Sequence, residues 1–120
     1  MGRRVVVTGM GAISPVGLDV NTTWDAIVAG RSGVGPITRF DTTDYRTTIA
    51  AEVKGFDPKI CIPAKEARRM DPFAQYALVA SHEAVRSARL PTGNEDGALG
   101  ARTAVIIGSG IGGIGTTTEQ

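Results

Sequence analysis

The chain has 120 residues, of which 42% are hydrophobic and 21% charged, with 16 glycines and 6 prolines. This is the composition of a globular protein, which excludes collagen, coiled coil and disorder, and the length allows at most one domain. Thirteen basic and twelve acidic side chains leave a formal charge of +1, too balanced for a protein that binds nucleic acid over its whole surface. We therefore expect any charged partner to meet a local patch.

The single cysteine and the single histidine exclude several kinds of site. Cys61 cannot form an internal disulfide, and with only His82 it cannot complete a zinc site. No apolar run approaches the ~18 residues of a membrane span. The sequence predicts a cytoplasmic protein without metal or membrane contact, in which Cys61 is a buried, inert thiol and His82 a structural or surface residue.

The first predicted elements are a strand and a helix. Residues 3–8 form a β-branched run without polar alternation, typical of a strand buried on both faces of a parallel sheet. The helix is predicted to start at a capping box made by Thr22 and Asp25 and to end at Gly30. Its apolar side chains share one face: Trp24, Ile27 and Val28.

Residues 31–63 show no helical period, and two short extended pieces are predicted there, around residues 37–40 and 49–53. Asp71, followed by proline, then predicts the start of the longest helix, from Phe73 to Arg89. A stripe of small side chains on this helix predicts that another segment packs very close to it: Ala77, Ala80, Ala84 and Ala88. A polar loop is expected to follow, as far as Gly100.

A second buried strand is predicted over residues 103–107, and a glycine-rich loop follows it. Three glycines match the dinucleotide-binding fingerprint, in which bare backbone approaches a pyrophosphate: Gly108, Gly110 and Gly113. The alternative is that these glycines only let chain segments pass closely. Ile111 and Ile114 are the large side chains of the loop, and such an isoleucine either lines an apolar pocket or packs into the core.

The order of these elements indicates an α/β fold. Two buried strands cannot make a sheet that is covered on both faces, because such sheets usually have about 4–6 strands. The sequence therefore predicts the opening part of a larger α/β protein.

Basic side chains gather over residues 59–69, where four bases accompany a single acid. If residues 65–70 are helical, at ~100° per residue, three of the cations fall on one face: Lys65, Arg68 and Arg69. Three cations on one face suit an acidic partner and would steer its approach. The alternative is an ordinary solvated helix face.

Several short motifs follow one another along the chain, at residues 4–11, 14–17, 24–33, 39–41, 69–73 and 107–113. In this order they resemble the start of the β-ketoacyl-acyl carrier protein synthases, most closely the synthase II type. The resemblance spans essentially all 120 residues. It implies a thiolase-like, layered αβαβα fold, of which residues 1–120 are the first part of the N-terminal half and so an incomplete N-terminal domain.

The resemblance also implies an activity. Synthases of this family are homodimeric acyltransferases of fatty acid biosynthesis, which extend an acyl chain by decarboxylative Claisen condensation with malonyl-acyl carrier protein and use no dissociable cofactor. Their catalytic cysteine and two histidines lie beyond the matched region, and neither Cys61 nor His82 matches them. We therefore expect no catalytic residue here and no condensing activity from these 120 residues alone. Because the predicted strands would have uncovered apolar faces and edges, we also expect no stable monomer.

Two functional positions carry over from the resemblance. Ile111 matches the isoleucine of the Gly-Ile-Gly-Gly loop that lines the acyl pocket. The basic residues that match the docking cluster for acyl carrier protein are Lys65, Arg68 and Arg69. Two alternatives stay open: a non-catalytic relative of the chain-length-factor type, and a Rossmann-type nucleotide-binding domain.

Overall fold

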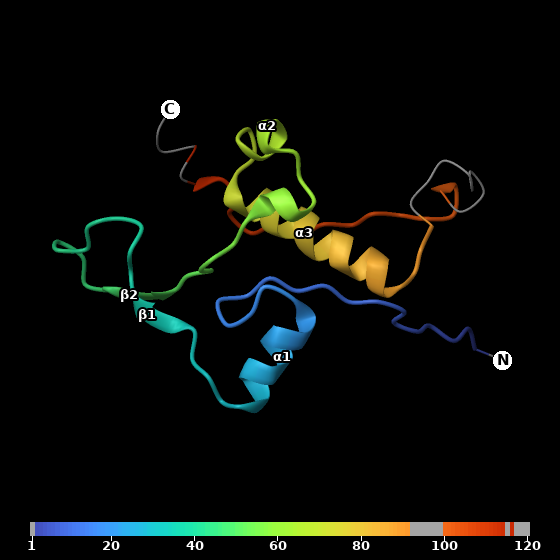
Figure 1. Ribbon diagram of the computed structural model, residues 1–120, viewed down its shortest axis with the longest axis horizontal. Helices are drawn as coiled ribbons and strands as arrows, with labels where there is room; N and C mark the ends of the chain where they lie inside the picture. Colours follow the sequence, from blue (N-terminus) through green and yellow to red (C-terminus); the bar gives the residue numbers. More distant parts are fainter. Residues whose placement is uncertain (1, 92–99, 115, 117–120) are drawn as a thin grey trace. The chain divides into compact units, whose positions relative to one another are not determined.

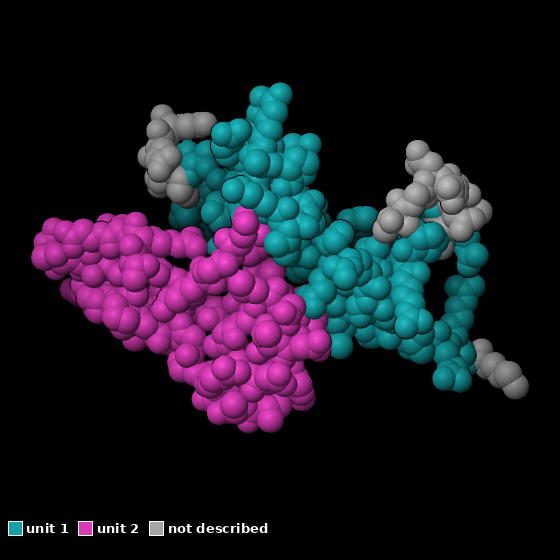
Figure 2. All heavy atoms as spheres, in the orientation of Figure 1, with its two compact units in different colours: residues 1–11, 58–120 teal, residues 12–57 magenta. Residues whose placement is uncertain are grey.

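The structure is a computed structural model that describes residues 2–91, 100–114 and 116. The chain divides into two compact units, Ala12–Asp57 and a second unit made of Met1–Gly11 with Pro58–Gln120 (Figure 2). The elements in chain order are α1 (Val20–Val28), β1 (Val34–Pro36), β2 (Ile49–Ala51), the 3-10 helix η1 (Pro58–Ile60), α2 (Ala64–Ala67) and α3 (Pro72–Ser87) (Figure 1). Within the described ranges, no helix combines the length and the apolar character needed to cross a bilayer.

Helix α1 begins at Asp19. This residue is extended, with φ −154°, and its Oδ1 accepts hydrogen bonds from the amide of Thr22 at 2.7 Å and from the Thr22 hydroxyl at 2.9 Å. The predicted capping box of Thr22 and Asp25 is therefore wrong. Thr22 lies inside the first turn, where its hydroxyl donates to the cap instead of acting as one.

The end of α1 follows the prediction. Gly30 has φ +65°, a conformation that costs glycine little, and its amide donates to the carbonyl of Ile27 at 3.0 Å. The amide of Arg31 donates to the carbonyl of Ala26 at 2.9 Å, which completes a Schellman motif. The apolar face of α1 is left largely uncovered, with Trp24 61% and Val28 70% exposed.

Strands β1 and β2 form an antiparallel pair in which Gly35 lies opposite Ala50. The second predicted piece, 49–53, contains β2, whereas the first, 37–40, lies just after β1. The chain leaves the ladder at Thr38 because the amide of Thr38 donates to the Glu52 carboxylate at 3.1 Å rather than to a backbone carbonyl.

The other unit is organised around α3, which Asp71 and Pro72 start as predicted. The 16-residue helix ends two residues earlier than expected, because Arg89 adopts φ +52° and cannot continue it. The buried apolar side chains near α3 are few: Ile62, Ala67 and Val79.

The small stripe of α3 is covered by the N-terminal glycine turn. A Cβ added at Gly11 would lie 1.8 Å from the carbonyl oxygen of Ala80, and one added at Gly9 would lie 2.3 Å from that of Ala84. These distances are far shorter than van der Waals contact, so only glycine fits at either position. The prediction that a segment packs very close to α3 is confirmed.

The two predicted buried strands are not strands in this chain. Residues 3–8 and 103–107 run as extended segments (Figure 1), and the one sheet among the described residues is the β1–β2 pair. Their side chains are exposed, Val5 by 94% and Ile106 by 92%. A strand of this composition needs neighbours on both edges and cover on both faces, and the described part of the chain supplies neither. Most of the predicted polar loop, residues 92–99, lies outside the described residues.

Candidate functional site

The basic residues predicted to bind an acidic partner lie on and just after α2. Lys65 is in the helix, Arg68 is its C-cap, and Arg69 follows. The regular helix is shorter than the predicted 65–70, because the amide of Arg69 donates to the carbonyl of Glu66 at 2.9 Å, which tightens the chain into a 3-10-like turn. We call Lys65, Arg68 and Arg69 the basic cluster.

The basic cluster faces solvent. Its three side chains are exposed, and none forms an ion pair with another residue of the described chain. On the opposite side of α2, Ala67 is 6% exposed and anchors the helix. The structure therefore brings the three predicted cations together on an open surface, next to the exposed acid Glu66.

A residue that the sequence analysis missed holds this surface in place. The side-chain amide of Gln75, in the first turn of α3, donates from Nε2 to the carbonyl of Ala67 at 2.8 Å and to that of Met70 at 3.0 Å. The sequence feature that could have indicated Gln75 is an amide side chain in the first turn of a helix that follows a very short helix. Nothing local in the sequence indicates which carbonyls it reaches.

The glycine-rich loop packs against the N-terminus of α3. A Cβ at Gly112 would lie 2.7 Å from the Phe73 ring, and one at Gly113, where φ is +77°, would lie 2.7 Å from Oδ2 of Asp71. Asp71 makes no side-chain cap bond to α3 and instead accepts a hydrogen bond from the hydroxyl of Thr116. Glycine at these two positions thus permits close approach.

The remaining glycines of the fingerprint have open space around them. Nothing lies within 4 Å of a Cβ added at Gly108 or at Gly110. Ile111 is 80% exposed. Its assignment to an acyl pocket stays a prediction.

An apolar cavity of about 380 Å³ lies where the glycine-rich loop begins. One side is formed by α3, and the other by the end of the 103–107 segment and the first loop residues. Its lining is Phe73, Ala74, Ala77, Leu78, Ile107, Gly108 and Ser109, which does not include Ile111.

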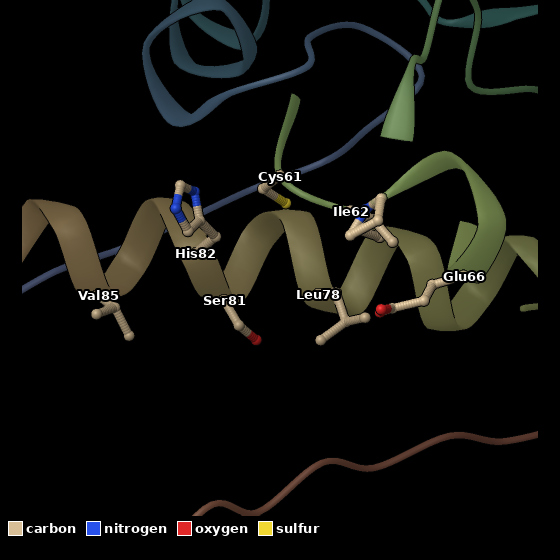
Figure 3. A pocket seen from close by; sticks show the side chains of 8 residues that line it. Cys61, Ile62, Glu66, Leu78, Ser81, His82 and Val85 are labelled. Atoms are coloured by element: carbon tan, nitrogen blue, oxygen red, sulfur yellow. The ribbon is translucent and has the colours of Figure 1, made fainter. Parts of the chain in front are cut away.

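A second cavity of about 380 Å³ lies between α3 and the segment that connects η1 to α2. Cys61 and His82 both line it, on the same side of α3 (Figure 3). Cys61 is half-buried, so the expectation of a buried thiol is wrong, whereas His82 is a surface residue as expected. No trio of His, Cys, Asp or Glu side chains suited to a metal ion occurs among the described residues.

Comparisons with known proteins point to one family. Residues 2–120 match the model described as "Beta-ketoacyl synthase, N-terminal domain". Two relatives share the name 3-oxoacyl-(acyl-carrier-protein) synthase 2. The protein from Staphylococcus aureus strain COL is 53% identical over 114 residues, which is 95% of this chain and 27% of the relative. The protein from Coxiella burnetii is 47% identical over 112 residues, which is 93% of this chain and 26% of the relative.

A solved structure, the ishigamide ketosynthase/chain length factor, superimposes with a TM-score of 0.65 at 41% identity, over 74% of this chain and 22% of that one. The chain thus spans only about 27% of the length of the curated relatives that it matches.

Proposed function

Because the chain belongs to the β-ketoacyl synthase family and matches its N-terminal domain, we propose that it is the carrier-docking part of a synthase that elongates acyl chains in fatty acid biosynthesis. The full-length relatives are named 3-oxoacyl-(acyl-carrier-protein) synthase 2. The complete protein would act in the cytoplasm as a homodimer, with no dissociable cofactor.

The reaction needs a nucleophile that this chain does not supply. A cysteine thiolate first takes the acyl group as a thioester, which releases the carrier thiol. Malonyl-acyl carrier protein then loses CO₂, and the resulting carbanion attacks the thioester carbonyl, which expels the cysteine thiolate and forms the new carbon–carbon bond. In the family the nucleophilic cysteine lies beyond the residues matched here, and Cys61, which lines the cavity beside α3, does not match it. The role of this chain is therefore binding.

The observation that carries the proposal is the exposed basic cluster on α2. Lys65, Arg68 and Arg69 are open to solvent, and the names of the relatives include the term acyl-carrier-protein. Each exposed ion pair contributes only about 0.2–1 kcal/mol. Three together would orient an acidic carrier and speed its approach rather than bind it tightly.

Charge reversal in the complete synthase tests this role. We expect Arg68→Glu combined with Arg69→Glu to raise the KM for acyl-acyl carrier protein about tenfold, because two attractions become repulsions of about 0.2–1 kcal/mol each. The effect should shrink as salt screens the charges. Acyl transfer from acyl-pantetheine, which has no protein to dock, should keep its KM.

Arg46→Glu is the matched control, because Arg46 is an exposed cation outside the cluster. An equal rise in KM for this control, or an unchanged KM for the double variant, would contradict the docking role.

We also propose that Ile111 lines the acyl pocket. The match of Ile111 to the pocket isoleucine of the family supports this, and its side chain, 80% exposed, is open to contact with an acyl chain. In the complete synthase, Ile111→Phe should lower kcat/KM for long acyl groups more than for short ones, because the larger ring occupies pocket volume. An unchanged chain-length profile would remove Ile111 from the pocket.

A second candidate is a non-catalytic relative of the chain-length-factor type. Its basis is the likeness to the ishigamide ketosynthase/chain length factor, a name that includes both a ketosynthase and a chain length factor. Mass spectrometry of the complete protein after brief treatment with iodoacetamide separates the two candidates. A synthase should be labelled rapidly at a cysteine other than Cys61, and a non-catalytic relative should not.

A further inference from the structure

The two hydrogen bonds of Gln75 enclose the part of the chain that carries Arg68 and Arg69. One reaches the carbonyl of Ala67, immediately before the two arginines, at 2.8 Å, and the other reaches that of Met70, immediately after them, at 3.0 Å. Both N–H groups of the amide are thereby used. The backbone of Arg68 and Arg69 is thus held at both ends from a neighbouring helix.

Few interactions within helix α2 stabilise it. It has four residues, far below the ~12–15 at which an isolated helix becomes even marginally stable. No side chain caps its N-terminus at Pro63. The bond that closes its C-terminal turn, from the amide of Arg68 to the carbonyl of Ala64, is long, at 3.4 Å.

The two carbonyl groups that Gln75 binds also show that the turn between α2 and α3 depends on this side chain. The carbonyl of Ala67 also accepts the amide of Met70 at 3.2 Å, but within the described residues the carbonyl of Met70 receives a hydrogen bond only from Gln75. Gln75 is half-buried. Loss of its amide would therefore free one carbonyl completely and leave the turn between α2 and α3 without its cross-link.

We propose that Gln75 is a positioning residue for carrier docking, which fixes the backbone of Arg68 and Arg69 and so the direction in which their side chains leave the surface. This inference rests on the proposed docking role of the basic cluster. Gln75 itself does not contact the carrier. It restricts the backbone of the two arginines before the carrier binds, so that they lose less conformational freedom on binding.

The test uses the complete synthase and two substrates. Gln75→Met keeps the length of the side chain and removes both donors. We expect it to raise the KM for acyl-acyl carrier protein about two- to threefold, which is no more than the loss of the two arginines would cost, and to leave kcat, and the KM for acyl-pantetheine, unchanged. Ser87→Met, at the far end of α3 and exposed, is the control and should leave both KM values unchanged.

A double-variant comparison excludes a merely structural effect. In a background of Arg68→Ala with Arg69→Ala, Gln75→Met should have no further effect on the KM for the carrier substrate, because no cations remain to be positioned. Gln75→Glu, which keeps the shape but cannot donate when ionised, is the second variant and should behave like Gln75→Met.

The outcomes separate the two proposals. If Arg68→Ala with Arg69→Ala has the KM of the wild type, the docking role itself is wrong. If that variant raises the KM but Gln75→Met and Gln75→Glu do not, the positioning role is overturned. A loss of kcat, or an equal rise in KM for both substrates, would also overturn it.

Discussion

At the scale of single residues, a few side-chain hydrogen bonds hold the ends of the helices. Asp19 and Gln75 show two ways of doing so. Asp19 starts α1 by accepting from a residue three positions ahead, whereas Gln75 ties down α2 from five and eight positions away. The first pattern is local and can be recognised in the sequence, although the capping-box pattern favours Thr22. The second depends on how the chain turns between two helices.

The Asp19 cap has a measurable contribution. We expect Asp19→Ala to weaken the first turn of α1 by about 0.5–2 kcal/mol, or about 2–30-fold in the amide-exchange protection of Thr22, because an orphan amide loses its acceptor. Asp25→Ala is the control, because Asp25 forms no cap in the structure. Equal losses in the two variants would show that Asp19 is not the cap.

The same cap predicts a dependence on pH. The amide and hydroxyl of Thr22 donate to Asp19 and hold the pKa of its carboxyl below the ordinary value of 3.8. A lowered folded-state pKa stabilises the fold above the unfolded-state pKa, and this stabilisation is lost as pH falls through the folded-state pKa. The protection of Thr22 should therefore fall below about pH 4 in the wild type. Asp19→Asn, which cannot titrate, should lack this step, and an identical step in both proteins would contradict the assignment.

At the scale of elements, the sequence predicts the two longer helices, α1 and α3, whereas the two predicted buried strands do not form in the described residues. Pro72 at the first helical position indicates the start of α3, although Asp71 before it forms no side-chain cap bond, and Gly30 specifies the end of α1. Residues 3–8 and 103–107 have the composition of strands, but a strand forms only where another strand offers its backbone. The basic cluster was predictable because, like the signals for the helix ends, it is local: its three charges lie within five consecutive residues.

The close contact between the N-terminal glycine turn and α3 should contribute to the stability of the protein. In the complete protein, Gly11→Ala should lower the free energy of unfolding by about 1–3 kcal/mol, because the added Cβ collides with backbone that cannot move out of the way. Gly2→Ala, where nothing lies within 4 Å, should leave it unchanged. A wild-type melting temperature for Gly11→Ala would show that the turn does not pack on α3 this closely.

At the scale of the whole molecule, apolar side chains remain uncovered. Among the described residues, four hydrophobic side chains are buried, while both predicted strand segments and the apolar face of α1 are exposed. Unpaired extended segments with exposed valine and isoleucine tend to pair with other chains. These surfaces fit a chain that spans about 27% of its relatives' length.

The 120-residue chain on its own should therefore behave differently from the complete synthase. We expect its apparent mass in light scattering to rise with concentration. We also expect no condensation product from acyl- and malonyl-acyl carrier protein, because Cys61, the one cysteine of these residues, does not match the catalytic cysteine of the proposed synthase. The complete synthase is the control for both measurements. A monomer with a single cooperative melting transition, or product formed by the isolated chain, would contradict this expectation.

The packing of Gly9 and Gly11 on α3 also constrains how the protein is made. The turn leaves the ribosome before the helix that covers it, since about 79 residues separate Gly9 from Ala88. At roughly 5–20 residues per second, that delay is about 4–16 s. Throughout this interval Gly9 and Gly11 have no helix to pack against, so the glycine turn can reach its final packing only after α3 has been made, and slower translation of the codons before α3 would lengthen the delay.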